Sequence, residues 1–191
     1  MTNHDVQAVV IGGGVVGLAS AAAIAARGRS VVVIERHPRP GMETSSHNSG
    51  VIHAGLYYPE GSLKAQLCVE GAERLYAFCA AHRVPHDRCG KLVAGVDDTE
   101  QPELERLHAL GTANGGRGLD LVGRAFIRRR EPHVDAKTAL WSPNSGRVNA
   151  HALVTALLRD GERAGMILLR GTRLVEGAPA SGGYRLRLER E

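Results

Sequence analysis

The chain has 191 residues, of which 43% are hydrophobic and 23% are charged, and its formal net charge is +4. This composition fits one good-sized globular domain, or one domain with part of another, and it excludes a disordered chain. The longest apolar stretch, residues 15–26, is shorter than the ~20 residues that cross a bilayer. The N-terminus lacks the basic region of a signal peptide, so the sequence predicts a cytoplasmic protein without a membrane span.

The basic residues and the cysteines indicate neither a nucleic-acid surface nor a metal site. The only basic run, residues 128–130, has no interleaved aromatic residues and is followed by Glu131, so a solvated helix end or loop is expected. Cys68, Cys79 and Cys89 lack metal-ligand spacing and are interpreted as reduced thiols, mostly packed as small apolar groups. We therefore expect no nucleic-acid partner and no metal.

The first segment predicts a βαβ unit, and thus an α/β fold. An apolar run at residues 6–11 is followed by a glycine-rich turn, an Ala-rich helix that ends at Gly28, and a second apolar strand at residues 30–35. Continuous apolar strands joined through a helix are typical of parallel strands that are buried on both faces.

Three glycines at the first strand-to-helix turn form the pattern G-x-G-x-x-G: Gly12, Gly14 and Gly17. In this pattern they permit a tight turn, let a pyrophosphate approach the backbone and let the helix pack on the strand. Glu35 ends the second strand, where a carboxylate accepts hydrogen bonds from an adenosine ribose and disfavours a 2′-phosphate. FAD or NAD is therefore expected rather than NADP, and the long polar loop at residues 36–61 favours FAD.

A long helix is expected after this loop. Ser62 is a suitable N-cap for it. Apolar residues then recur at steps of three and four, which places them on one helix face, and a glycine on that face suggests close packing against another backbone. The members of this face are Leu63, Leu67, Gly71, Leu75 and Phe78.

The remainder of the chain predicts further alternation of helices and strands. Residues 117–147 show no clear period and are expected to be irregular, with one strand at residues 138–141. Asn149 is expected to cap the last helix, with Leu153 and Leu157 on its apolar face. The other predicted elements are a strand at 91–96, a helix at 103–113, a strand at 166–170, a turn at 177–183 and a strand at 184–190.

Several segments together are similar to a known family. They are VVIGGGVVGLASAAAIAARGRSVVVIE, SSHNSGVIHAGLYYPEGSLKAQLCVEG, CGKLVAG, TANGG and REP. The sequence resembles the FAD-dependent oxidoreductases of the D-amino-acid-oxidase/glycerol-3-phosphate-dehydrogenase superfamily and, within it, the L-2-hydroxyglutarate dehydrogenase and oxidase family. The resemblance covers nearly the whole chain but only the N-terminal half of such an enzyme, so a truncated chain is expected.

The resemblance implies a Rossmann-like FAD-binding domain of the D-amino-acid-oxidase type, with part of an α+β substrate domain inserted into it. Residues 1–84 would form the first part of the FAD-binding domain, comprising the βαβ unit, a flavin loop and a helix. Residues 85–145 would form a partial substrate domain, and residues 146–191 an incomplete return to the FAD-binding domain.

The resemblance also implies a reaction, in which a 2-hydroxy acid is oxidised by hydride transfer to the flavin and its hydroxyl proton passes to a base. The expected small-molecule substrate is L-2-hydroxyglutarate, which becomes 2-oxoglutarate, with a quinone or oxygen as electron acceptor. Peripheral contact with the inner membrane is compatible with this. Two alternatives stay open: a flavoenzyme acting on an amine or glycerol phosphate, and a non-catalytic FAD-binding fragment.

The resemblance assigns site residues to the segment around the polar loop. His53 is predicted to be the base, since the pKa of histidine lies near operating pH; a histidine that only hydrogen-bonds the flavin or a carbonyl is the alternative. Tyr57, Tyr58 and Lys64 are expected on the substrate side, with core packing and a solvated lysine as alternatives. The predicted FAD-binding residues are Gly12, Gly14, Val16, Gly17, Glu35, Arg36, Thr44, Ser45, Ser46, Asn48, Ser49, Gly50 and Val175.

Overall fold

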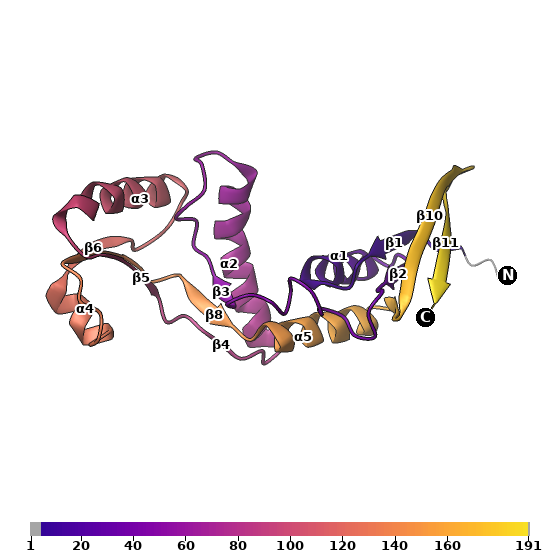
Figure 1. The fold of residues 1–191 in the computed structure, drawn as a ribbon. Helices are drawn as coiled ribbons and strands as arrows, with labels where there is room; N and C mark the ends of the chain where they lie inside the picture. Colours follow the sequence, from indigo (N-terminus) through magenta and orange to yellow (C-terminus); the bar gives the residue numbers. More distant parts are fainter. Residues whose placement is uncertain (1–4, 191) are drawn as a thin grey trace. The chain divides into compact units, whose positions relative to one another are not determined.

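The computed structural model describes residues 5–190, which divide into two units (Figure 1). Unit 1 combines the chain up to Asn48 with the chain from Ala150 onward, and unit 2 is Ser49–Asn149. Residues 1–4, which contribute to the prediction about a signal peptide, lie outside the described range.

Unit 1 is built on the predicted βαβ arrangement. Strands β1 (Ala8–Ile11), β2 (Val31–Ile34) and β9 (Ile167–Leu169) form a parallel sheet in the order β1-β2-β9. Helix α1 (Val15–Ala25) connects the first two strands and packs against α5 (Ala150–Arg163), as Figure 1 shows. The parallel pairing of β1 with β2 confirms the predicted βαβ unit.

Small residues allow α1 and α5 to approach each other closely. A Cβ atom added to Gly161 of α5 would lie 3.5 Å from the Cβ of Ala22 in α1, and only 2.7 Å from the sulfur of Met166.

The expected burial of both strands holds for β2, but it was wrong for β1, whose Ile11 is 62% exposed. The reason is that β1 is an edge strand and Ile11 borders a cavity.

A long antiparallel hairpin completes unit 1. It consists of β10 (Thr172–Ala180) and β11 (Gly183–Arg190), and its pairing register shifts between Leu174 and Glu176. The prediction of a turn over residues 177–183 was wrong in extent, because strand pairing continues to Ala180 and Gly183. Residues 181–182 alone make the turn, with Gly182 at a φ of +81°.

Unit 2 contains two three-stranded antiparallel sheets, in the orders β3-β8-β4 and β5-β7-β6. The prediction of an irregular segment at 117–147 was wrong apart from its one strand: short elements occur there, held by pairing with distant strands rather than by a local period. The elements are β3 (Val51–Ile52), α2 (Leu63–Ala81), β4 (His86–Asp87), β5 (Lys91–Gly95), η1 (Asp98–Glu100), α3 (Gln101–Ala113), β6 (Asp120–Gly123), α4 (Arg124–Arg130), β7 (Thr138–Ser142) and β8 (Gly146–Val148).

Helix α2 begins as predicted but buries a different face. The hydroxyl of Ser62 accepts a hydrogen bond from the backbone N–H of Ala65 at 3.2 Å, which confirms the N-cap. The predicted face was wrong in its first half, because Leu63 and Leu67 are 68% and 56% exposed and a Cβ on Gly71 would meet no atom within 4 Å. Leu75 of that face does pack, partly buried, against the cluster of Ile52, Ala72 and Tyr76. Smaller or sheet-facing residues are buried instead, namely Ala65, Ala72, Tyr76 and Cys79.

Two sequence-level expectations concern single groups in unit 2. The arginine run at residues 128–130 ends α4, which confirms a helix end, and the Arg130 guanidinium lies 4.0 Å from the ring centre of Trp141. All three cysteines are free thiols; Cys79 is buried, whereas Cys89 is exposed.

Between residues 5 and 190 we find no helix that combines the length and apolarity needed to cross a membrane.

The limits of the two units differ from the three-part division expected from the sequence. The chain passes from unit 1 to unit 2 after Asn48 and returns to unit 1 after Asn149, so α2 belongs to unit 2. These limits describe which segments pack together and not which segments bind a cofactor. The division into residues 1–84, 85–145 and 146–191 therefore stays a prediction.

Candidate functional site

The glycine-rich turn of unit 1 has the backbone geometry that the motif requires. Gly12 has a φ of +103°, in the region that favours glycine. A Cβ on Gly17 would lie 2.0 Å from the carbonyl oxygen of Gly12, so only glycine fits there. A Cβ on Gly14 would lie 3.1 Å from the Ser45 hydroxyl, which restricts this position as well. The turn thus brings the start of α1 and its backbone close to the end of β1.

Glu35 is a buried carboxylate at the end of β2, with 7% of its surface exposed. One carboxylate oxygen accepts the backbone N–H of Gly13 at 2.7 Å, and the other accepts that of His37 at 2.8 Å. These bonds fix the carboxylate beside the glycine turn. A carboxylate has about four acceptor positions, so Glu35 can still accept hydrogen bonds from the hydroxyls of a ligand.

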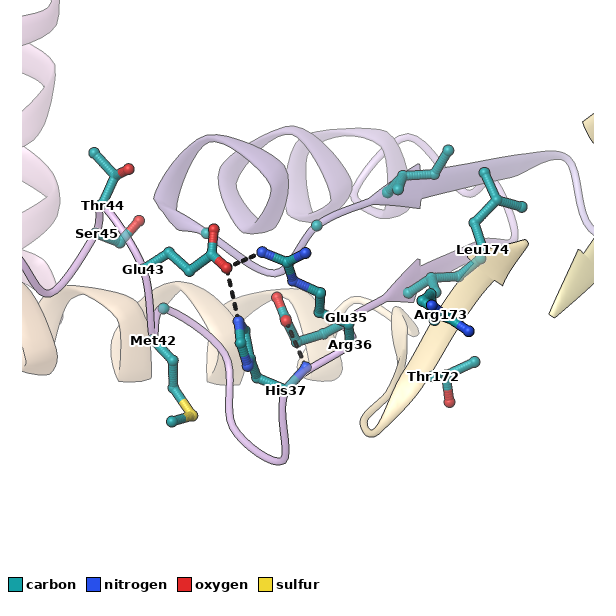
Figure 2. Close-up of a pocket in the computed structure, with 15 residues that line it drawn as sticks. Glu35, Arg36, His37, Met42, Glu43, Thr44, Ser45, Thr172, Arg173 and Leu174 are labelled. Carbon is teal, nitrogen blue, oxygen red and sulfur yellow. Dashed lines mark hydrogen bonds and ion pairs between the residues drawn. The ribbon is translucent and has the colours of Figure 1, made fainter. Parts of the chain in front are cut away.

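A cavity of about 590 Å³ lies against this turn within unit 1 (Figure 2). Its volume falls in the range of small-molecule and cofactor sites. Six predicted cofactor residues line it: Gly12, Gly14, Glu35, Arg36, Thr44 and Ser45. The lining also includes residues that were not among the predicted site residues, namely Ile11, Ile34, His37, Gly41, Met42, Glu43, Thr172, Arg173 and Leu174.

A cluster formed by Arg36, His37 and Glu43 fastens the loop that follows β2. Figure 2 shows both basic side chains directed at the Glu43 carboxylate, and the His37 ring nitrogen lies 2.8 Å from it. The hydrogen bond from His37 and the ion pair with Arg36 lower the pKa of Glu43. Sequence reasoning missed Glu43, since a single acidic residue in a polar loop gives no signal of its partners.

Ser45 joins this loop to the N-terminus of α1. Its hydroxyl oxygen accepts the backbone N–H of Val15 at 3.0 Å, while the residue at the N-cap position, Gly14, has no side chain to do so. A hydroxyl that accepts one bond still has its own proton to donate. Ser45 can therefore donate to an anion at the helix N-terminus, where the partial positive charge of the helix favours phosphate.

Four predicted cofactor residues in the N-terminal segment of unit 1 do not line the cavity. Val16 is 77% exposed, and Gly17 packs on the Gly12 backbone. The side chains of Ser46 and Asn48 bond carbonyls of their own loop, at 3.1 Å to Glu43 and at 3.0 Å to Thr44 and Ser45. This is the arrangement of a polar turn that satisfies its own backbone, and it leaves Thr44 and Ser45 as the loop residues at the cavity.

Val175 and two residues near the start of unit 2 complete the predicted cofactor set. Val175 is 39% exposed and sits where the β10–β11 register shifts, one residue beyond the cavity-lining Leu174. Ser49 is exposed. Gly50 has a φ of +67°, and a Cβ there would lie 2.5 Å from the carbonyl oxygen of Val148. Gly50 therefore serves a close approach between backbone segments of unit 2.

His53 of unit 2 is an exposed residue between buried Ile52 and Ala54, and two lysines lie near it. Partial burial lowers the pKa of its imidazole, and the positive charges of Lys91 and then Lys64 lower it further. Tyr57 and Tyr58 lie on the same segment and contact these lysines. The structure thus brings His53, which was predicted as the base, together with Tyr57, Tyr58 and Lys64, which were predicted for the substrate side, and adds Lys91.

Asn114, at the end of α3, fixes this segment. Its amide nitrogen donates to the carbonyl oxygens of Gly55 at 2.9 Å and Tyr58 at 2.8 Å. Between them, Leu56 is buried in a core with Leu104, Leu107 and Leu140. Nothing in the sequence signals this role, because the partners of Asn114 lie more than 50 residues away.

The fold and the cavity define a dinucleotide-binding α/β protein, with a glycine turn, an acidic residue after β2 and a polar loop closing on the helix N-terminus. The comparison with protein families makes this specific: the family described as "FAD dependent oxidoreductase" matches residues 7–190, and the chain belongs to it. This confirms the resemblance to the D-amino-acid-oxidase superfamily, the fold class and FAD as the cofactor of the family.

Curated relatives are similar over most of the chain. The L-2-hydroxyglutarate dehydrogenase of Nematostella vectensis is 38% identical over 94% of the chain, and that of Arabidopsis thaliana is 43% identical over 83%. The human protein of the same name is 39% identical over 82% of the chain. The chain covers only 39%, 33% and 34% of these three relatives, so it spans about a third of their length.

Solved structures share the fold across nearly the whole chain. The L-α-glycerophosphate oxidase of Mycoplasma pneumoniae, with FAD bound, superposes with a TM-score of 0.90 over 99% of the chain and 51% of its own length, at 22% identity. Glycine oxidase from Geobacillus kaustophilus gives a TM-score of 0.87 over 97% of the chain and 52% of its own length, also at 22% identity. At these identities the likeness establishes the fold alone.

Proposed function

We propose that this protein takes part in the FAD-dependent oxidation of L-2-hydroxyglutarate to 2-oxoglutarate. The observation that carries the proposal is the 38–43% identity to relatives named L-2-hydroxyglutarate dehydrogenase. The residues within each unit support it, because unit 1 has a cavity that suits a dinucleotide and unit 2 has a histidine with cationic neighbours.

The residues of unit 1 fit the dinucleotide part of FAD. Gly12 and Gly14 leave room for a pyrophosphate at the start of α1, and Ser45 has a hydroxyl proton to donate to it. Glu35 has acceptor capacity for ribose hydroxyls. Leu174, on the cavity wall, and the neighbouring Val175 lie on the strand proposed to meet the adenine. When bound, FAD supplies the acceptor for the hydride.

His53 supplies the base in this proposal. Because its pKa is lowered, the imidazole is neutral at neutral pH and has a free ring nitrogen to take the hydroxyl proton of the substrate. The neighbouring ammonium groups of Lys64 and Lys91 favour an anionic substrate, such as a carboxylate, near this base. Tyr57 and Tyr58 would border the same substrate.

The electron acceptor and the cellular location belong to the proposal as well. A quinone or oxygen would reoxidise the flavin, in a cytoplasmic protein with peripheral contact at the inner membrane. The three relatives are themselves named as mitochondrial proteins.

The test is reduction of the flavin in the purified protein. A yellow protein should lose its flavin absorption band under anaerobic conditions when L-2-hydroxyglutarate is added, and the D-enantiomer should leave the band unchanged. Bleaching by glycerol 3-phosphate or glycine instead would favour the activities of the two structural relatives named above. A colourless protein that takes up no FAD would contradict the proposal, and a yellow protein that none of these substrates bleaches would support a non-catalytic FAD-binding fragment.

A further inference from the structure

Two lysines of unit 2 stand out because the chain is otherwise rich in arginine. Of its 24 basic residues only three are lysines, Lys64, Lys91 and Lys137. Lys137 pairs with the carboxylate of Asp98 at 2.6 Å. Within the described part of the chain, neither Lys64 nor Lys91 forms an ion pair with a carboxylate; both contact tyrosines instead.

These two lysines reach adjacent tyrosines from different elements. Lys91, at the start of β5, donates to the Tyr57 hydroxyl at 2.6 Å, and its nitrogen lies 4.6 Å from the centre of the Tyr57 ring. Lys64, in the first turn of α2, places its nitrogen 4.4 Å from the centre of the Tyr58 ring. The tyrosine pair is itself held by Asn114 and by buried Leu56. Both cations therefore lie against one segment that is anchored by these contacts.

The groups around His53 leave this positive charge uncompensated. Burial raises the pKa of Tyr58 and of the Cys68 thiol, so both are neutral at neutral pH. The ammonium groups of Lys64 and Lys91 are the charges that act on His53. A small anion beside His53 would therefore find two cations and no competing carboxylate among these groups.

We propose that Lys64 and Lys91 bind the two carboxylates of a dicarboxylic 2-hydroxy acid, and that they select it over monocarboxylic acids. The identity of the acid rests on the function proposed above, whereas the two-point recognition rests on the lysines. The bond from Lys91 to Tyr57 uses one of three ammonium protons and leaves two for a carboxylate. A dicarboxylate gives each lysine a carboxylate of its own, whereas a monocarboxylate has one group for both.

The experiment measures binding of glutarate, a dicarboxylate without a hydroxyl to oxidise, to the full chain by calorimetry. Lys64→Met and Lys91→Met should each weaken glutarate binding about tenfold, which corresponds to 1.4 kcal/mol. Lys137→Met is the matched control and should leave the affinity unchanged, because its partner is Asp98. Lys64→Arg and Lys91→Arg keep the charge and should recover part of the affinity.

A second readout follows His53 directly by NMR titration of its imidazole. Glutarate should raise the His53 pKa by neutralising the two cations, and each methionine variant should raise it in the absence of glutarate. Glutarate that binds no better than butyrate, or equally well to both methionine variants and the parent, would overturn the proposal.

Flavin reduction separates this proposal from the proposed function. If L-2-hydroxyglutarate fails to reduce the flavin while glutarate binding still depends on both lysines, the reaction is wrong and the dicarboxylate site stands. If L-2-hydroxyglutarate reduces the flavin and the methionine variants keep the parent's preference for it over lactate, the reaction stands and the dicarboxylate site is wrong.

Discussion

The two units build their candidate sites from different parts of the chain. In unit 1 the decisive features are backbone features: the turn at Gly12, the absence of a side chain at Gly17 and the N–H groups bound by Glu35. In unit 2 they are side chains from four segments, namely His53, Lys64, Lys91 and Asn114. A site made by the backbone occupies a short stretch of sequence, whereas a site made by side chains depends on tertiary packing. The units should therefore respond differently to substitution.

The largest effect is expected at Gly17 in unit 1. Gly17→Ala would place a methyl group 2.0 Å from the Gly12 carbonyl oxygen, and the backbone would have to move. We expect unfolding to become easier by about 3 kcal/mol or more, with loss of bound flavin. Denaturant unfolding and the flavin spectrum measure both.

Gly71→Ala is the control for this substitution. Its added Cβ meets no atom within 4 Å and lies inside helix α2, so stability should rise by up to about 1 kcal/mol. Equal effects of the two alanines would contradict the steric explanation of the glycine turn.

The next effect is expected at Glu35. Glu35→Gln keeps the size of the side chain but loses the charge, and its amide NH₂ group would face a backbone N–H. We expect a loss of about 2 kcal/mol in stability and weaker FAD binding, measured by thermal unfolding and by flavin titration. Glu60→Gln, at an exposed position, should change neither. Parental FAD affinity in Glu35→Gln would show that the Glu35 carboxylate does not contribute to FAD binding.

In unit 2, Asn114→Ala should lower turnover without releasing the cofactor. It removes both bonds that hold the segment at Gly55 and Tyr58, at an expected cost of about 1–2 kcal/mol in stability. These bonds anchor the segment that carries His53, the base in the proposed function, so kcat should fall while the flavin spectrum stays parental. Gln66→Ala, which loses one exposed local bond at 3.3 Å, is the control. Parental kcat in Asn114→Ala would show that the segment needs no such support.

The smallest effect concerns pH. With His53 as the proposed base, its lowered pKa keeps the imidazole neutral to below pH 6.5, the ordinary value for histidine, and activity should be lost only as pH falls through the lowered pKa. Lys91→Met removes one cation and should move this acidic limb of kcat/KM upward. Lys137→Met should leave the limb unmoved. If Lys91→Met leaves the acidic limb of kcat/KM at its parental pH, a group other than His53 is responsible for the limb.

The sequence was informative where contacts are local and silent where they are not. The βαβ unit, Gly12 and Glu35 could be predicted because their spacing alone defines the turn. Lys91 and Asn114 could not, because they meet residues 34 to 59 positions away. The leucine period of α2 was misleading at Leu63 and Leu67, since Ala72 and Tyr76 pack with Ile52 and Val148 instead. The short strands after residue 117 have no period long enough to recognise.

The cluster of Arg36, His37 and Glu43 has a consequence for the kinetics of cofactor exchange. Its members line the cavity, and the side chains of Arg36 and Glu43 are 61% and 56% exposed. Attraction between exposed charges is screened by dissolved ions, over about 8 Å at physiological ionic strength and about 3 Å at 1 M salt. Salt therefore loosens the loop that carries Thr44 and Ser45, so the dinucleotide should leave and enter faster as ionic strength rises, while the glycine turn, which contains no charge, keeps its shape.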